Sequence, residues 1–132
     1  MSDDVEYLDL DDLVAAAEVA VGRRADVRDW GLLEAALARP QATVFGEDAY
    51  PSLDAKAAAL VHSVVTGHAL VDGNKRLGLV ALLLFYGLNG YTLTASEDER
   101  VELILAIADG GLRDVEKISQ HLAPWVVPLT SG

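Results

Sequence analysis

Cysteine is absent from this chain of 132 residues, and basic residues are scarce. Without cysteine the chain forms neither a disulfide framework nor a thiolate metal site. Only 10 Lys and Arg stand against 21 Asp and Glu, giving a formal net charge of −11. Binding of nucleic acid needs a basic face, so this charge balance argues against it. Any phosphate group must therefore be bound by a local cluster of cations.

Long apolar runs are also missing. The longest, about Leu77 to Leu88, contains glycine and is shorter than the roughly 20 residues that a membrane-spanning helix needs. The first residues, Met1 to Glu6, do not show the basic and then apolar pattern of a secretion signal. We therefore expect a cytoplasmic protein without membrane contact. Hydrophobic residues make up 52% of the chain, and no repeat or linker interrupts it, which predicts a single domain over residues 1–132.

Helical periodicity dominates the chain. Capping residues and glycine or proline stops divide it into six expected helices. These run from Asp9 or Asp11 to about Val21, from Asp29 to about Ala38, from Ser52 to a break at Gly67, from about Asn74 to Leu88, from Ser96 to the Gly110-Gly111 pair, and from about Asp114 to Leu122.

Three features complete the predicted all-α class. The fourth helix is apolar nearly all round, as expected for a helix at the centre of a small bundle. Residues 41–51 are rich in strand formers around Gly46, which predicts a short hairpin or flap. Tyr91 to Thr94 are extended at most briefly, and the tail from Pro124 is expected to cover apolar surface. The predicted fold is a bundle of about six helices around a buried central helix, with a hairpin-like flap.

The candidate chemistry lies at residues 68–76, His-Ala-Leu-Val-Asp-Gly-Asn-Lys-Arg, where the third helix gives way to the fourth. His68 suits a general base, because an unperturbed imidazole has a pKa of about 6.5. The alternative interpretation of His68 is a structural histidine packed at a helix end. Asp72 is a hard oxygen ligand of the kind that Mg²⁺ uses. Its alternative, compatible with the first, is the N-cap of the fourth helix.

The last four residues of this stretch indicate phosphate binding. Gly73 permits close approach of a phosphate, or simply makes a turn. Asn74 can fix the loop, contact phosphate or form a local turn. Lys75 and Arg76 oppose the dipole at the start of the fourth helix by roughly 0.3–1 kcal/mol each, a penalty that a bound anion removes. The alternative interpretation of these two residues is ordinary surface charge. We interpret the stretch as a nucleotide site.

The same residues resemble the signature of the Fic/Doc family, H-x-F-x-D-A/G-N-K-R, in the form carried by its death-on-curing branch. The likeness covers about the whole chain up to the last helix. Residues 28–41, RDWGLLEAALARPQ, are similar to a stretch of many Doc-like chains, and further matches are Tyr50-Pro51-Ser52-Leu53, Lys56-Ala57-Ala58-Ala59-Leu60 and Leu88-Asn89-Gly90-Tyr91. Leu70 stands where the family usually has phenylalanine, and we expect it to anchor the loop in the core.

The resemblance implies a Fic/Doc helical fold and a toxin of a toxin–antitoxin pair. Such a toxin transfers the γ-phosphate of ATP, with Mg²⁺, to a threonine or serine hydroxyl of a target protein. In Doc toxins the target is translation elongation factor Tu, so translation halts, and a Phd-like antitoxin restrains the toxin. Carried over by position, His68 is the catalytic base and Asp72 positions Mg²⁺. The phosphate-binding residues are then Gly73, Asn74, Lys75 and Arg76.

Two other functions remain open at this point. Fic relatives that transfer AMP carry glycine at the position of Lys75, so Lys75 favours phosphate transfer over AMP transfer. A third possibility is an inactive Fic-fold binding module, against which the presence of both His68 and Asp72 argues. The other two histidines, His62 and His121, are expected to have structural roles, and three separated histidines without cysteine do not suggest zinc.

Overall fold

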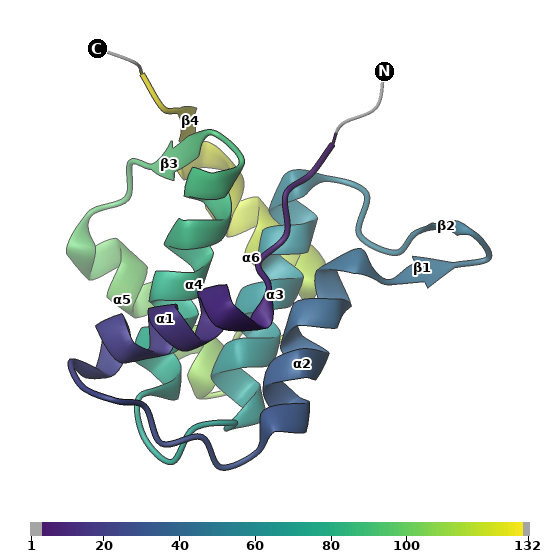
Figure 1. The fold of residues 1–132 in the computed structure, drawn as a ribbon. Coiled ribbons are helices and arrows are strands. Elements are labelled where there is room, and N and C mark those ends of the chain that lie inside the picture. Colours follow the sequence, from purple (N-terminus) through teal and green to yellow (C-terminus); the bar gives the residue numbers. More distant parts are fainter. Residues whose placement is uncertain (1–3, 131–132) are drawn as a thin grey trace.

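The computed structural model describes residues 4–130 and consists of helices joined by short connections (Figure 1). This confirms the predicted all-α class. The helices are α1 (Leu10–Val21), α2 (Trp30–Ala38), α3 (Leu53–Gly67), α4 (Asn74–Leu88), α5 (Glu97–Ala108) and α6 (Val115–Leu122). Short 3₁₀ turns, η1 (Arg39–Gln41) and η2 (Ala123–Trp125), extend α2 and α6.

The helix ends follow from local sequence. In five helices a side-chain oxygen at the N-cap accepts a backbone N–H of the first turn, which satisfies a donor that the helix itself leaves free. These caps are Asp9, Asp29, Ser52, Ser96 and Asp114. The sequence predicted Asp29, Ser52 and Ser96 as caps and Asp9 as one of two candidates, whereas Asp114 was predicted only as the approximate start of its helix. Asp9 and Ser96 form reciprocal capping boxes with the third helical residue. Gly22 ends α1 in the left-handed conformation, with φ at 79°.

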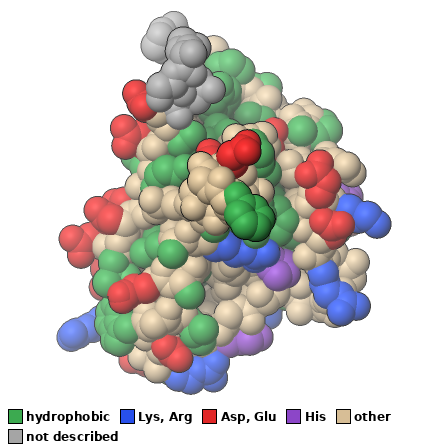
Figure 2. Space-filling view, turned by 90° about the vertical axis from the view of Figure 1, so that its right-hand side faces the viewer, with side chains coloured by type: hydrophobic (Ala, Val, Ile, Leu, Met, Phe, Trp, Pro, Cys, Tyr) green, Lys and Arg blue, Asp and Glu red, His purple; other side chains and the backbone are tan. Residues whose placement is uncertain are grey.

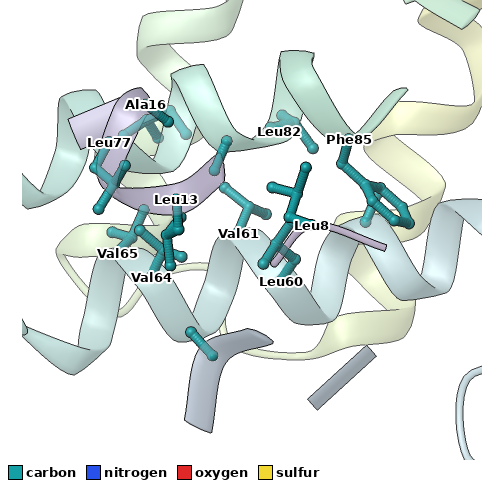
Figure 3. Packing of buried hydrophobic residues seen from close by; sticks show 14 of the residues in the cluster. Leu8, Leu13, Ala16, Leu60, Val61, Val64, Val65, Leu77, Leu82 and Phe85 are labelled. Carbon is teal, nitrogen blue, oxygen red and sulfur yellow. The ribbon is translucent and has the colours of Figure 1, made fainter. Parts of the chain in front are cut away.

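Two helices share the centre of the bundle. α3 packs against α2, α4, α5 and α6, and α4 packs against α1, α3 and α5. Figure 3 shows Leu60, Val61 and Val65 of α3 beside Leu77 and Leu82 of α4, with Leu13 of α1 closing the cluster. The prediction of α4 as the central helix therefore needs refinement. α4 leaves Leu84 and Leu88 exposed at its far end, whereas α3 contributes more of the core.

Close packing between α3 and α4 depends on Gly78. A Cβ at this position would lie 2.4 Å from Cγ2 of Val65, far inside van der Waals contact. Farther along the same interface, the buried hydroxyl of Tyr86 donates a hydrogen bond of 2.7 Å to Oδ1 of Asp54 at the start of α3. Burial and this bond raise the pKa of Tyr86. The two helices are thus held together at both ends.

The predicted flap is a short antiparallel hairpin, β1 (Thr43–Val44) with β2 (Glu47–Asp48), which projects from the bundle in Figure 1. Its link to the bundle is a buried cation. The ammonium of Lys56, 2% exposed on α3, lies 3.1 Å from Oδ2 of Asp48 and also donates to the carbonyl of Tyr50. A buried charge is tolerated only when paired in this way, so Lys56 fixes the base of the flap.

The tail forms a second hairpin. β3 (Tyr91–Leu93) pairs antiparallel with β4 (Val126–Pro128), so the chain end returns to the turn after α4. Trp125 and Val126 pack against the core, which confirms the expectation that the tail covers apolar surface. The strand pairing itself was not predicted. Across residues 4–130, each helix is too short or too polar to pass through a bilayer.

Substituting Gly78 tests the α3–α4 packing. Gly78→Ala should lower the free energy of unfolding by about 1–3 kcal/mol, because the added methyl meets a stiff valine in a packed core. Gly87→Ala in the same helix is the control. Its Cβ meets nothing within 4 Å, so it should be neutral or stabilising by about 0.5–1 kcal/mol. Urea denaturation of both variants decides the point, and equal stabilisation by both would contradict it.

Candidate functional site

The loop between α3 and α4, residues 68–73, runs beside the segment that joins α1 to α2, at the bottom of Figure 1. We call residues 26–29 of that segment the strap. The backbone N–H groups of Arg28 and Asp29 donate to the carbonyl of Ala69, at 2.7 and 3.1 Å, and Val71 donates to Asp26 at 3.0 Å. Val27 and Leu70 form a β-bridge. The strap therefore fixes the loop along most of its length.

His68 begins the loop as the C-cap of α3. α3 ends at Gly67, as predicted, but the residue that takes the left-handed conformation is His68, with φ at 56°. Such a φ is uncommon for a residue with a side chain, although histidine is among the types that tolerate it. The Arg28 guanidinium donates to the His68 carbonyl. The imidazole itself is exposed and accessible to a substrate.

Leu70 is the loop anchor, as predicted. It is 1% exposed and belongs to the hydrophobic core. Its backbone is held by the side chain of Asn74, whose Oδ1 accepts from the Leu70 N–H and whose Nδ2 donates to the Leu70 carbonyl, both at 3.0 Å. Of the three roles considered for Asn74, this places its amide in fixing the loop. Phosphate contact by its backbone N–H remains compatible with that role.

Gly73 is the N-cap of α4. Its φ is 92°, and a Cβ there would lie 2.8 Å from Cγ2 of Val21 on α1, so both the conformation and the close approach favour glycine. The interpretation of Asp72 as the helix cap is therefore wrong. The exposed carboxylate of Asp72 leaves the first turn uncapped.

The start of α4 differs from the other helices of residues 4–130, since a side-chain cap is missing there and its first turn holds no acidic residue. The first helical bond runs from Leu77 N–H to the Gly73 carbonyl. The preceding N–H groups, those of Asn74, Lys75 and Arg76, have no partner within the helix. Lys75 and Arg76 are exposed beside them. The free N–H groups, the positive end of the helix dipole and the two cationic side chains thus lie together at the start of α4, an arrangement suited to a phosphate.

One cavity brings the predicted site residues together. It has a volume of about 470 Å³ and is lined by His68, Asp72, Gly73, Asn74, Lys75 and Arg76, with Val65, Val71 and Ala108 completing its walls. Figure 2, which keeps the vertical axis of Figure 1, shows basic and histidine side chains mainly in the lower half of one face, toward the end where the loop lies. A candidate base, a carboxylate and an anion site therefore share one hollow.

The metal-binding potential of this cavity is limited to one carboxylate. Within the described chain, His, Asp and Glu side chains form no group of three that could hold a metal ion by themselves. Asp72 fits a Mg²⁺ ion that takes one protein carboxylate and completes its shell with water and substrate phosphates. It does not fit a tightly held structural metal.

The remaining histidines lie outside this cavity. Nδ1 of His62 is 2.9 Å from Nη1 of Arg39, which also donates to Ser63 Oγ, while Arg39 Nε donates to the Tyr50 hydroxyl. Burial and the nearby Arg39 charge lower the pKa of His62. His62 thus joins η1 to α3, as its predicted structural role requires. His121 lies in the last turn of α6.

Reasoning from sequence missed the support of the loop. Arg28 was noted only as part of a similar stretch, yet it holds the His68 carbonyl from 40 positions away. Neither Val21 nor Ala108 was assigned to the site, although Val21 lies close to Gly73 and Ala108 lines the cavity. Only the resemblance over residues 28–41 hinted at Arg28, since local patterns carry no information on such distant contacts.

Asn74 and Asp72 offer a matched stability test. Asn74→Ala should lower the free energy of unfolding by about 1–3 kcal/mol, because it leaves both backbone groups of buried Leu70 unsatisfied. Asp72→Ala, in the same loop, should stay within about 0.5 kcal/mol of the parent. Chemical denaturation measures both. A larger loss for Asp72→Ala than for Asn74→Ala would reverse the assigned roles.

Comparison with known proteins agrees with this arrangement. A model described as the Fic/DOC family matches residues 7–86, which include the strap, the loop and most of α4. A protein named Toxin Doc from Mycolicibacterium smegmatis is 45% identical over 128 residues, which cover 96% of this chain and 98% of that relative. A match of this extent, with the signature residues in one cavity, places the chain in the Fic/DOC family.

Proposed function

We propose that this protein is the toxin of a toxin–antitoxin pair and that it transfers the γ-phosphate of ATP to a serine or threonine hydroxyl of a target protein. The observation that carries the proposal is the shared cavity of His68, Asp72 and the uncapped, cationic start of α4. The similarity to a protein named Toxin Doc supports the role as toxin.

The proposed reaction uses the cavity as follows. The N–H groups at the start of α4, with Lys75 and Arg76, hold the triphosphate. His68 takes the proton of the target hydroxyl, whose oxygen then bonds to the γ-phosphorus while the bond from that phosphorus to the β–γ bridging oxygen breaks, and ADP leaves. Asp72 would hold a Mg²⁺ ion, which when bound would neutralise phosphate charge. The strap keeps His68 in place, so positioning supplies much of the rate.

The target and partner are proposed from the family resemblance. In Doc toxins the acceptor is a threonine of translation elongation factor Tu, and we propose the same target here, which would halt translation. A Phd-like antitoxin is the proposed restraining partner. The alternative chemistry is AMP transfer. Lys75 favours phosphate transfer, because its exposed ammonium occupies the space that glycine leaves free in the AMP-transferring relatives.

Labelled ATP tests the reaction directly. The protein is incubated with bacterial lysate and ATP labelled at either the α or the γ phosphate, with a His68→Ala sample as control. We expect γ label, and no α label, on a protein of the size of elongation factor Tu. Transfer of α label would overturn the kinase proposal in favour of AMP transfer, and transfer of neither label would favour the binding module.

His68→Ala should abolish growth arrest on expression. Removing a general base typically costs a factor of about 10²–10⁴ in rate. The exposed imidazole contributes little to the core, so the variant should melt within a few degrees of the parent, which serves as the control for folding. Toxicity equal to that of the parent would exclude the role.

Asp72→Asn should weaken binding of Mg-ATP by about tenfold or more, because the amide keeps the size and loses the charge that the metal requires. Binding of ATP without Mg²⁺ should change little or improve, as a negative charge near the phosphates is removed. Calorimetry with and without Mg²⁺ distinguishes these effects. Unchanged Mg-ATP affinity would remove Asp72 from the site.

Lys75→Gly should shift the product from phosphate toward AMP, since it opens the space beside the start of α4 and changes which phosphate settles there. Mass spectrometry of the modified target shows the outcome as an added phosphate for the parent and an added AMP for the variant. Phosphate transfer by the variant at the parent's rate would show that Lys75 does not select the chemistry.

A further inference from the structure

A cavity between α5 and the end of α6 plays no part in the proposed reaction. It has a volume of about 420 Å³ and is lined by α5, by Gly111 and Leu112 of the following turn, and by His121 and Trp125. α5 lies at the edge of the bundle, at the left of Figure 1, and both α5 and α6 pack on α3. We call the cavity the α5–α6 groove.

The α5–α6 groove and the polar cavity that contains His68 meet different sides of α5. Four residues with the i, i+3, i+4, i+7 spacing of one helix face line the groove: Glu99, Glu102, Leu103 and Ala106. Ala108, which lines the polar cavity, lies two positions beyond Ala106. Since each residue of a helix turns by about 100°, Ala108 lies on the opposite side of α5. The body of the helix therefore separates the two cavities.

The floor of the α5–α6 groove is apolar. Leu103 is buried and belongs to the hydrophobic core, and Leu112 and Trp125 are partly buried against that core. The side chain of Trp125 lines the groove, so part of it is open to a ligand. An accessible indole binds apolar groups through its large surface and cations through its π-face. The floor thus suits an aliphatic side chain with a cation beside it.

The rim of the α5–α6 groove is acidic. Glu99 and Glu102 are exposed, and within residues 4–130 neither belongs to an ion pair. Oε1 of Glu99 accepts the Ser96 N–H at 2.8 Å, which holds this carboxylate in place at the edge of the groove. The described residues that line the groove include neither lysine nor arginine. The groove therefore attracts cations, and a second copy of this chain, with its net charge of −11, is a poor occupant.

We infer that the α5–α6 groove binds a short basic amphipathic segment of a partner protein. Its aliphatic side chain lies on the apolar floor, and its arginine or lysine side chains meet Glu99, Glu102 and Trp125. Charge complementarity carries the inference, because an apolar floor alone would accept any apolar segment, whereas two carboxylates beside an indole select cations. The stretch from Glu99 to Ala106 is about 10 Å long, which matches about three residues of extended chain. The polar cavity stays open when this segment is bound, because it lies across α5.

Fluorescence of Trp125 tests the inference. The chain has two tryptophans, and Trp30→Phe, at an exposed position, leaves Trp125 as the only emitter. The probe is a capped tripeptide with arginine on both sides of leucine, and the matched probe has glutamine in place of each arginine. We expect the arginine probe to bind with a Kd of about 1 mM or below, and about fivefold or more tightly than the glutamine probe. Saturating Mg-ATP should change its affinity by less than about twofold, because the polar cavity is separate.

Two double variants locate the probe. Glu99→Gln with Glu102→Gln should weaken binding of the arginine probe about three- to tenfold, as expected for the loss of two exposed ion pairs. Glutamine at position 99 can still form the capping box with Ser96, so the start of α5 is kept. Glu18→Gln with Glu34→Gln removes the same charge from exposed positions of α1 and α2, and should change binding by less than about twofold.

Four results would overturn the inference. Equal affinity for the two probes would show that the groove does not select cations. Equal loss in the two double variants would reduce the effect to net charge, and displacement of the probe by Mg-ATP would place it in the polar cavity. The fourth is absence of binding of the arginine probe up to about 10 mM. The inference does not rest on the proposed function, so failure of γ-phosphate transfer leaves it standing.

Discussion

The connection between α3 and α4 has to bring the chain from one buried helix into the next while leaving the first N–H groups of α4 uncovered. Most contacts around the site serve this requirement. Leu70 is buried under the loop, Asn74 holds Leu70 from within, and the strap holds Ala69 and Val71 from outside. The interior bonds of the loop are thus satisfied by protein, and the free donors face the cavity.

The free N–H groups at the start of α4 explain how a strongly acidic chain has a locally positive site. Elsewhere the first turns of the helices carry acidic residues or side-chain caps, which neutralise the positive end of the dipole. At α4 both are missing, and Lys75 and Arg76 add further positive charge. The resulting local field is intrinsically unfavourable for the folded protein. It becomes favourable when an anion is bound, so stability and ligand binding are coupled there.

Local patterns in the sequence were sufficient for the helices and for the composition of the site. Asp9, Asp29 and Ser52 are caps because their short polar side chains reach the backbone next to them, and such signals do not depend on tertiary structure. The same holds for the turn at Gly73, although the competing role given to Asp72 was wrong. Contacts between distant segments carry no such signal. The strap, the burial of Lys56 beneath the flap and the β3–β4 pairing became evident only from the structure.

The polar cavity takes its lining from two distant parts of the chain. His68 and the residues up to Arg76 lie within the family match, whereas Ala108 of α5 lies beyond its end at residue 86. On the proposed function, a substitution at Ala108 would change the shape of the cavity and leave the proposed reacting groups as they are. One wall of the cavity is thus separate from the signature in the sequence.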